Sequence, residues 1–463
     1  MSDNFRVDKQ GGKRKLFGTD GMRGQANRYP MTPELVMRLA QAAAVVLRNG
    51  DHPNRVVIGK DTRLSGYMFE SALRAGFICM GTHCLQVGSL PTPAIAFLTR
   101  ALKADVGVMV SASHNPFYDN GIKFFDPNGR KLPDTVEAEI ERVLFEGDLE
   151  TCQPVPEEIG KAFRIEDAGG RYIEFCKHSF PRRLRLSGIR VVLDCANGAS
   201  YRVAPTVLWE LGAEVIAIGD KPNGTNINDG FGSLHPRRIQ EKVLETRADV
   251  GIAFDGDADR VILCDEQGRI LDGDHILAMC AMDMQQNNTL RGQGVVATVM
   301  SNLGLERLLK GHGLTLERTQ VGDRYVLEYM ETHGYNLGGE QSGHIILLDH
   351  NTTGDGLVSA LKVLALLASR QRPMSELSGE LKLVPQLLHN IPIPRGSDPL
   401  SSPQVREAIA QAESDLADQG RVLVRQSGTE SKIRVMVEGD SRIRIDEVAR
   451  ELCSVIRSCA NDS

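Results

Sequence analysis

Short apolar runs rich in β-branched residues recur along the chain, and each is bounded by glycine or polar residues. Runs of this length and composition are typical of buried strands in a largely parallel sheet. The strands predicted in this way cover residues 55–59, 106–110, 190–194, 214–218, 248–254, 295–299, 421–424 and 433–437.

Helical periodicity separates many of these runs, most clearly in residues 32–50. Thr32 suits the N-cap, Pro33 the first helical position and Gly50 the stop. The alternation of strands and helices predicts doubly wound α/β modules. Further helices are predicted to run to about Met80 and Leu211 and to begin near Gly304.

The length of 463 residues predicts several cores, because a single core rarely exceeds about 250–300 residues. The polar residues 147–168, rich in Pro and Glu, suit a boundary. The Pro-rich residues 390–395 suit a linker or an edge segment near a smaller last domain. Ala104–Gly107 and Ala248–Gly251 are identical tetrapeptides that each open a strand, which favours duplicated modules.

Composition limits the partners. With 41% hydrophobic and 25% charged residues and a net charge of −6, we expect neither a nucleic acid nor a membrane as partner. The sequence shows no signal peptide and no apolar run near about 18 residues, so we expect a cytoplasmic protein. The nine cysteines form no Cys-x-x-Cys pair, which favours buried thiols over a zinc site or disulfides.

The predicted strand 106–110 leads into Ser111-Ala112-Ser113-His114-Asn115-Pro116. Asn115-Pro116 ends the strand and Asn120-Gly121 predicts a tight turn, so Ser113 would lie on a constrained loop at a strand's end. A serine held in this way suits a nucleophile or a phosphate carrier. The alternative is a plain turn with an incidental hydroxyl.

Asp255, Asp257 and Asp259 follow another predicted strand and give the strongest metal signal in the chain. Alternate carboxylates on one loop can converge on a hard cation, and oxygen ligands without His or Cys suit Mg²⁺. Counting from the two tetrapeptides places Ser113 opposite Asp257 in the duplicated modules. The alternative is a solvated acidic turn.

Four other segments carry candidate chemistry. Residues 17–24 form a glycine-punctuated loop that is either a plain turn or presents Arg23 to an anion. We expect Lys60 and Arg63 at the surface rather than at the site. Residues 336–344 place Glu340 and Ser342 among glycines, which suits sugar hydroxyls or a simple bulge. Residues 425–431 predict either a hairpin turn or a phosphate clamp, with candidates Arg425, Ser427, Gly428 and Thr429.

These motifs resemble, in order and spacing, those of the α-D-phosphohexomutases. The matching stretches are Thr-Asp-Gly-x-Arg-Gly at 19–24, Ser-Ala-Ser-His-Asn-Pro at 111–116, Asp-Gly-Asp-Ala-Asp-Arg at 255–260, Gly-Glu-Gln-Ser-Gly at 339–343 and Arg-x-Ser-Gly-Thr-Glu at 425–430. Residues 117–123, Gln341 and residues 352–356 are most similar to the bacterial members that act on glucosamine phosphates. Ser431 departs from the proline that the family commonly has there.

The resemblance implies three related α/β modules and a smaller C-terminal α+β domain around a central cleft, at residues 1–150, 165–265, 266–375 and 385–463. It implies a phosphorylated Ser113 that, with Asp255, Asp257 and Asp259, holds one Mg²⁺. Arg23 and Lys123 would neutralise charge, and His114 or Lys123 would move the hydroxyl proton. Substrate binding is implied for Arg260, for Glu340 and Ser342 at sugar hydroxyls, and for Arg425, Ser427, Gly428 and Thr429 at a phosphate.

The activity implied is interconversion of glucosamine 6-phosphate and glucosamine 1-phosphate, with glucosamine 1,6-bisphosphate as intermediate and activator. The product would feed UDP-N-acetylglucosamine and cell-wall peptidoglycan synthesis. The substrate would be a small hexosamine phosphate, and the protein a monomer or homodimer. The alternatives are a mutase of glucose or mannose phosphates and a non-catalytic sugar-phosphate sensor. The intact serine and Asp triplet speak against the sensor.

Overall fold

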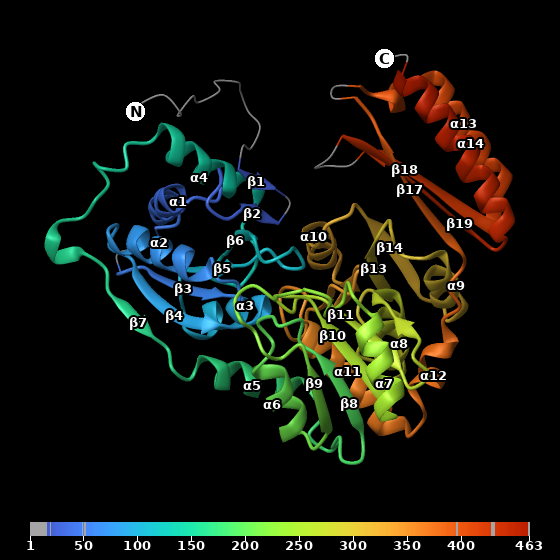
Figure 1. Cartoon of the computed structure of the whole chain (residues 1–463), viewed down its shortest axis with the longest axis horizontal. Coiled ribbons are helices and arrows are strands. Elements are labelled where there is room, and N and C mark those ends of the chain that lie inside the picture. Colours follow the sequence, from blue (N-terminus) through green and yellow to red (C-terminus); the bar gives the residue numbers. More distant parts are fainter. Residues whose placement is uncertain are drawn as a thin grey trace. The chain divides into compact units, whose positions relative to one another are not determined.

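The computed structural model describes residues 16–18, 20–48, 50, 52–394, 397–426 and 431–461. The internal contacts divide the chain into two compact units, residues 1–272 with 342–375 and residues 273–341 with 376–463 (Figure 1). The four domain ranges expected from the sequence stay a prediction. In the part of the chain that is described, no helix has the length and apolar character needed to span a bilayer.

A seven-stranded sheet forms the first part of the first unit. Its strands are β1 (Phe17–Gly18), β2 (Gly21–Gln25), β3 (Arg55–Lys60), β4 (His83–Ser89), β5 (Val106–Val110), β6 (Asp119–Phe125) and β7 (Ala162–Arg164). They lie in the order β1-β2-β6-β5-β3-β4-β7. β3, β4, β5 and β7 are parallel, whereas β6, β2 and β1 extend one edge in antiparallel pairs.

Helices cover both faces of this sheet. They are α1 (Pro33–Val46), α2 (Gly66–Ile78), α3 (Thr92–Ala101) and α4 (Asp134–Glu146), with the short 3-10 helix η1 (Pro156–Glu158). The hydroxyl of Thr32 caps α1 as predicted. Side chains of α1, α2 and α4 share a core with Ile58 and Val108. On the other face Gly59 and Gly107 let α3 approach closely, since a Cβ there would collide with Ile95 and Thr99.

A five-stranded sheet follows in the same unit. Its strands are β8 (Arg190–Asp194), β9 (Glu214–Ile218), β10 (Val250–Phe254), β11 (Val261–Asp265) and β12 (Ile270–Leu271), in the order β12-β11-β10-β8-β9. The accompanying elements are α5 (Ala168–Ser179), α6 (Val203–Glu210), α7 (Arg237–Thr246), β16 (Ile345–Leu347) and α11 (Gly356–Arg370). The series β11-β10-β8-β9 repeats the order and directions of β6-β5-β3-β4. This repetition agrees with the predicted duplication.

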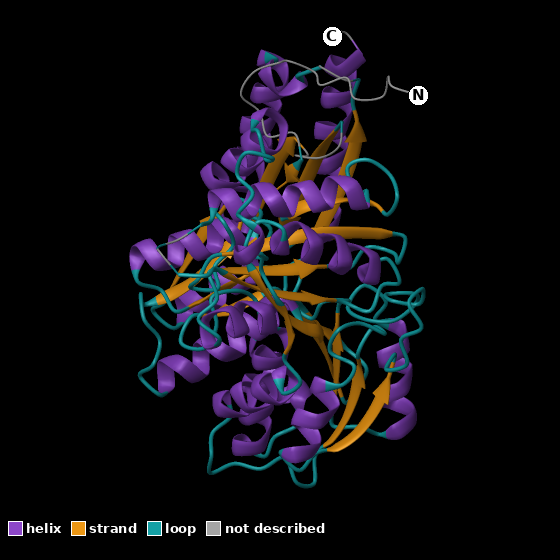
Figure 2. Cartoon of the chain, turned by 90° about the vertical axis from the view of Figure 1, so that its left-hand side faces the viewer, coloured by secondary structure: helices purple, strands orange, loops and turns teal. Residues whose placement is uncertain are grey.

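The second unit contains a parallel sheet of β14 (Thr315–Thr319), β13 (Gly294–Thr298) and β15 (Leu337–Gly339). It also contains an antiparallel sheet of β17 (Gln386–Pro392), β19 (Lys432–Gly439) and β18 (Gly420–Gln426). Two helices, α13 (Pro403–Leu416) and α14 (Arg442–Asn461), lie side by side against the antiparallel sheet (Figure 1), and Figure 2 shows helices flanking the strands. The remaining elements are α8 (Gly273–Gln286), α9 (Leu303–Gly311), α10 (Asp323–His333), η2 (Ser378–Glu380), η3 (Pro399–Ser401) and η4 (Ala417–Gln419). α12 (Met374–Leu377) spans the boundary between the units.

All of the predicted strands are confirmed within two or three residues at their ends. Two local predictions are wrong. Asn120-Gly121 is not a turn but part of β6, where Gly121 lies against the carbonyls of Ser111 and Met22. Residues 21–25, expected in a loop, form β2, because β6 supplies an antiparallel partner that the local sequence does not reveal.

Candidate active site

Ser113 lies on the loop between β5 and β6, at the carboxyl end of a parallel strand. Its side chain is buried and its φ is +51°, in the left-handed region that non-glycine residues rarely adopt. The backbone N–H of Ser113 donates to Ser111 Oγ at 2.9 Å. The loop is therefore constrained, as the sequence predicts.

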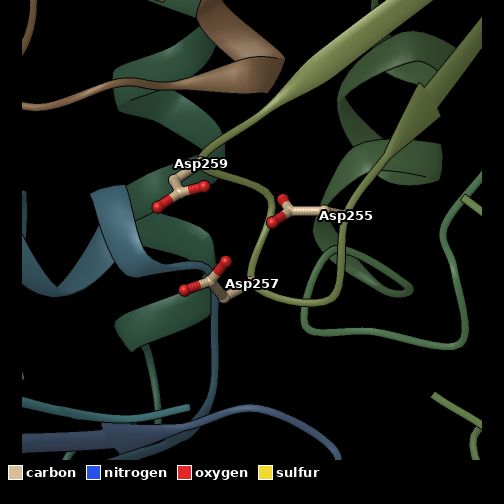
Figure 3. A group of neighbouring side chains, drawn as sticks. All are labelled: Asp255, Asp257 and Asp259. Atoms are coloured by element: carbon tan, nitrogen blue, oxygen red, sulfur yellow. The ribbon is translucent and has the colours of Figure 1, made fainter. Parts of the chain in front are cut away.

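Asp255, Asp257 and Asp259 follow β10, and each is at least 97% buried. One carboxylate oxygen from each lies within 4.8 Å of the others, and Figure 3 shows the three side chains directed toward a common space. Ser113 Oγ donates to Asp255 Oδ2 at 2.6 Å. Gly256 permits this approach, because a Cβ there would lie 2.6 Å from the carbonyl oxygen of Ser113.

The carboxylate cluster fits a hard divalent cation. Among the described residues, Asp257 Oδ1 and Asp259 Oδ1 are buried and have no hydrogen-bond partner. Burial and the neighbouring charges of Asp259 and Asp257 raise the pKa of Asp255 well above its usual value. Three buried carboxylates with open lone pairs and no His or Cys among them suit Mg²⁺.

Lys123 projects from β6 and is fully buried. Its Nζ lies 3.0 Å from Asp257 Oδ2, 3.5 Å from Asp259 Oδ2 and 3.1 Å from Asp20 Oδ2. Burial acts to lower the pKa of Lys123, but these three carboxylates outweigh it and raise that pKa strongly. Lys123 is therefore a permanent cation in this arrangement.

Arg23 and Lys131 also meet Asp20, each in an ion pair. Burial opposes ionisation of Asp20, yet Lys123, Lys131 and Arg23 together hold its pKa well below the usual range. Arg23 Nη1 points back toward the serine loop, 3.5 Å from the carbonyl oxygen of Ala112. Sequence reasoning missed Asp20 as a site residue, although it stands in the same short motif as Arg23.

His114 follows the serine directly, and its Nδ1 lies 3.2 Å from Ser113 Oγ. Arg260 Nη1 lies 3.1 Å from the same nitrogen and must donate, so Nδ1 accepts. Burial, then the charges of Arg260 and Arg23, lower the pKa of His114 to about 4. The imidazole is consequently neutral at neutral pH.

Two further side chains orient the carboxylates, and sequence reasoning missed both roles. Thr92, the first residue of α3, donates through Oγ1 to Asp257 Oδ2 at 2.6 Å. His344 Nε2 accepts from the N–H of Gly354 at 3.0 Å, so its Nδ1–H faces Asp259 Oδ2 at 3.7 Å. Both contacts join residues far apart in sequence.

The surface positions expected for Lys60 and Arg63 are wrong. Lys60 forms a buried ion pair with Glu70, and its Nζ lies 4.2 Å from the ring centroid of Tyr67. Arg63 has no exposed surface and contacts Asp61 at 2.8 Å. Charged residues at a strand's end suggest a solvated face, but here residues of α2 pair with Lys60 and the serine loop encloses Arg63.

The remaining predicted residues are distributed over both units. Ser342 belongs to the first unit and Glu340 to the second, where Glu340 Oε1 accepts from the N–H of Gly322 at 3.1 Å. Arg425 lies on β18 directly opposite Arg434 on β19. Burial and the charge of Arg434 lower the pKa of Arg425. Ser427, Gly428 and Thr429 lie outside the described residues.

Four family models match consecutive stretches of the chain. They describe phosphoglucomutase/phosphomannomutase alpha/beta/alpha domain I at residues 14–151, domain II at 170–268, domain III at 272–383 and the C-terminal domain at 388–455. The predicted fold class, α/β modules with a smaller C-terminal α+β domain, is confirmed by these matches and the observed sheets.

Known relatives cover nearly the whole chain. A protein of Magnetococcus marinus named phosphoglucosamine mutase is 65% identical over 97% of this chain and 92% of its own length. The protein of that name from Geotalea uraniireducens is 56% identical, with 96% and 98% covered. A solved phosphoglucomutase/phosphomannomutase family protein from Burkholderia thailandensis superposes with a TM-score of 0.79 at 22% identity, over 95% and 97% of the two chains. Aspergillus fumigatus N-acetylphosphoglucosamine mutase, solved with GlcNAc-6P and magnesium, gives 0.67 at 19% identity over 97% and 96%.

The Asp triplet can be tested by metal binding alone. Asp257→Asn is expected to weaken Mn²⁺ binding at least tenfold, since even changes outside the ligand shell cost about 10- to 100-fold in affinity. Mn²⁺ titration followed by electron paramagnetic resonance measures this, with Asp418→Asn in the exposed 3-10 helix η4 as the matched control. Equal Mn²⁺ affinity in all three proteins would identify the triplet as an acidic turn.

Proposed function

Because the chain belongs to the phosphoglucomutase/phosphomannomutase family, we propose that it interconverts glucosamine 6-phosphate and glucosamine 1-phosphate. It is an enzyme, an intramolecular phosphotransferase. The amino-sugar substrate is supported by the name that its relatives at 65% and 56% identity carry.

One observation carries the proposal for the carrier of the phosphoryl group. Ser113 Oγ lies 2.6 Å from Asp255 Oδ2, at the point where the loops after two equivalent strands meet. A hydroxyl buried against a carboxylate cluster is far from bulk water, which favours transfer to a sugar over hydrolysis. We assign Ser113 as the residue that carries the phosphoryl group.

The surrounding charges suit phosphoryl transfer, which depends on alignment and neutralisation of charge. When bound to Asp255, Asp257 and Asp259, Mg²⁺ supplies positive charge beside the phosphoserine. Lys123 and Arg23 add two fixed cations from β6 and β2. Their role is to hold the phosphoryl oxygens and offset the negative charge that spreads over them.

In the first half-reaction, the 1-hydroxyl oxygen of glucosamine 6-phosphate forms a bond to the phosphorus of phosphoserine 113. The bond from phosphorus to Ser113 Oγ breaks, Oγ keeps the electron pair, and the proton lost by the attacking hydroxyl is passed on to Oγ, so that Ser113 is released as its hydroxyl. The product is the 1,6-bisphosphate. After it turns over, Ser113 Oγ attacks the 6-phosphate in the reverse sense and glucosamine 1-phosphate leaves.

Geometry favours His114 over Lys123 for handling the proton at Ser113. His114 Nδ1 lies 3.2 Å from Ser113 Oγ, whereas the Nζ of Lys123 is directed at Asp20, Asp257 and Asp259. A neutral imidazole nitrogen can accept a proton, and a lysine held by carboxylates stays charged. We therefore assign His114 as the acceptor of the Ser113 proton when Oγ attacks the 6-phosphate, and electrostatic stabilisation to Lys123.

The other assignments complete the proposal. Glu340 and Ser342 bind sugar hydroxyls, Arg260 binds substrate, and Arg425 with Ser427, Gly428 and Thr429 holds the phosphate that is not transferred. Two arginines directly opposite on β18 and β19 repel each other, which a bound dianion would relieve. The same proposal includes one bound Mg²⁺ and the 1,6-bisphosphate as activator. It also includes a cytoplasmic protein, monomer or homodimer, whose product supplies peptidoglycan synthesis.

Ser113→Ala is expected to fold normally and to lose turnover by about a thousandfold or more, because the phosphoryl carrier is removed. Intact-mass and phosphopeptide analysis after incubation with the 1,6-bisphosphate should find one phosphoryl group on Ser113 of the wild type. Ser71→Ala, on the exposed face of α2, serves as control. Near-normal turnover in Ser113→Ala would exclude the phosphoserine mechanism.

The substrate is tested with a panel of glucosamine, N-acetylglucosamine, glucose and mannose 6-phosphates. We expect the highest kcat/KM for glucosamine 6-phosphate, in line with the names of the relatives. A preference for glucose or mannose phosphates would show that the protein is a phosphoglucomutase or phosphomannomutase and not a glucosamine phosphate mutase. Binding without turnover of every sugar would indicate a sensor.

Arg425→Ala is expected to lower kcat/KM in both directions by about 100-fold, since a charge-assisted hydrogen-bond pair contributes about 2–3 kcal/mol. The clamp would hold the 6-phosphate in one half-reaction and the 1-phosphate in the other, so neither direction is spared. Arg425→Lys keeps the positive charge but loses the forked guanidinium, so its kcat/KM should lie between those of wild type and Arg425→Ala. The measurement is kcat/KM in the forward and reverse directions, with Arg450→Ala on α14 as control. An unchanged kcat/KM of Arg425→Ala in either direction would refute the clamp.

A further inference from the structure

The guanidinium of Arg63 uses all five of its N–H donors inside the first unit. Nε donates to Asp61 Oδ2 at 2.8 Å. The other four go to backbone carbonyls of the serine loop and of the first residue of β6: Nη2 to Ser113 and Asn115 at 2.8 Å each, and Nη1 to Asp119 at 3.1 Å and to Pro116. The side chain has no exposed surface.

These four carbonyls need several donors, and among the described residues Arg63 is the one side chain that reaches all of them; the carbonyl of Pro116 also accepts from the N–H of Asp119 at 3.1 Å. A buried backbone carbonyl without a hydrogen bond costs about 1–3 kcal/mol, so a loop that turns several of them inward is unstable alone. Ser113 also holds a positive φ, a conformation that persists only where the surroundings impose it. Arg63 meets both demands from outside the loop.

A second connection reaches the amide of the same serine. Asp61 Oδ2 accepts from Ser111 Oγ at 2.6 Å, and Ser111 Oγ accepts from the N–H of Ser113 at 2.9 Å. Asp61 Oδ1 also accepts from the backbone N–H of Arg63 at 3.0 Å, which orients the carboxylate. The N–H and the C=O of Ser113 are thus both tied to the Asp61–Arg63 pair.

Asn228 provides a further contact to the backbone of the loop. Its Nδ2 donates to the carbonyls of Ser113 and Asn115 at 2.9 and 3.0 Å, the two that Arg63 Nη2 also binds. Asn228 follows β9, in the module that carries the Asp triplet. The side chain therefore ties the serine loop to that module.

We infer that Arg63 is a positioning residue for phosphoryl transfer, which fixes the backbone of Ser113 so that Oγ is aimed at the Asp triplet. The inference rests on the proposed role of Ser113 as phosphoryl carrier. Arg63 itself touches neither the reacting hydroxyl nor the carboxylates of the triplet; its contacts are with loop carbonyls and Asp61. Its effect should appear in the chemical step and not in substrate binding.

Lysine cannot reproduce this arrangement. Arg63→Lys keeps the charge but offers three donors from one nitrogen, which cannot span carbonyls as far apart as residues 113 and 119. A displacement of a reacting group by about 1 Å can cost about 100-fold in rate. We expect kcat to fall by about 100-fold while KM stays within about threefold.

The experiment compares wild type, Arg63→Lys, Asn228→Gly and Arg38→Lys. Arg38 is the matched control, because it lies on α1 of the same module and donates to one carbonyl, that of Leu144, at 3.4 Å. Glycine suits position 228, where φ is +59°. The readouts are kcat and KM, the rate at which glucosamine 1,6-bisphosphate phosphorylates Ser113 in a single turnover, and Mn²⁺ affinity.

The expected pattern is a slow phosphorylation of Ser113 and a low kcat in Arg63→Lys, with KM and Mn²⁺ affinity near those of wild type and Arg38→Lys. Asn228→Gly should lower kcat by only about tenfold, because Arg63 still binds the carbonyls of Ser113 and Asn115. A folded Arg63→Lys that phosphorylates Ser113 at the wild-type rate and keeps the wild-type kcat would overturn the inference. If Arg63→Lys does not fold, wild-type rates in Asn228→Gly would overturn it instead. Absence of phosphate on wild-type Ser113 would instead overturn the proposed function.

Discussion

Lys123 is buried between carboxylates of two different modules, and the first unit depends on this contact. Asp20 comes from the β1–β2 hairpin of the first sheet, and Asp257 and Asp259 come from the loop of the second. Burying an ammonium is costly unless partners compensate for its lost hydration, so the hairpin, β6 and the Asp loop must assemble together. Local sequence preference alone would not bring Asp20 to the site.

The repeated strand order explains how one unit produces two complementary loops. β5 and β10 occupy equivalent places in their sheets, and the loops that follow them diverge in chemistry. One loop supplies a hydroxyl on a strained backbone, and the other supplies three carboxylates. Because both leave the carboxyl ends of parallel strands, duplication places the hydroxyl of Ser113 2.6 Å from the carboxylate of Asp255 without a dedicated connecting element.

The sequence predicts those parts of the structure that depend on nearby residues. The eight strands formed by apolar runs, the Thr32 cap and the Ser113 and Asp loops follow from local composition and short motifs. It does not predict that Arg63 is buried, because its partners lie about fifty residues away and a charged residue after a strand usually meets solvent. Asn120-Gly121 indicated a turn for the same reason: pairing with β2 overrides local preference. The roles of Thr92 and His344 likewise arise only from tertiary contact.

The contacts around Ser113 divide into two groups with different physical effects. Arg63, Asn228 and Ser111 bind the backbone of Ser113, and they determine where its hydroxyl lies. Lys123, Arg23 and the Asp triplet determine the charge that the hydroxyl meets. Backbone hydrogen bonds are short-ranged and directional, whereas interactions between buried charges extend over several ångströms. A change in the first group should therefore act on the geometry of transfer and leave the cation-binding carboxylates intact, and a change in the second should do the reverse.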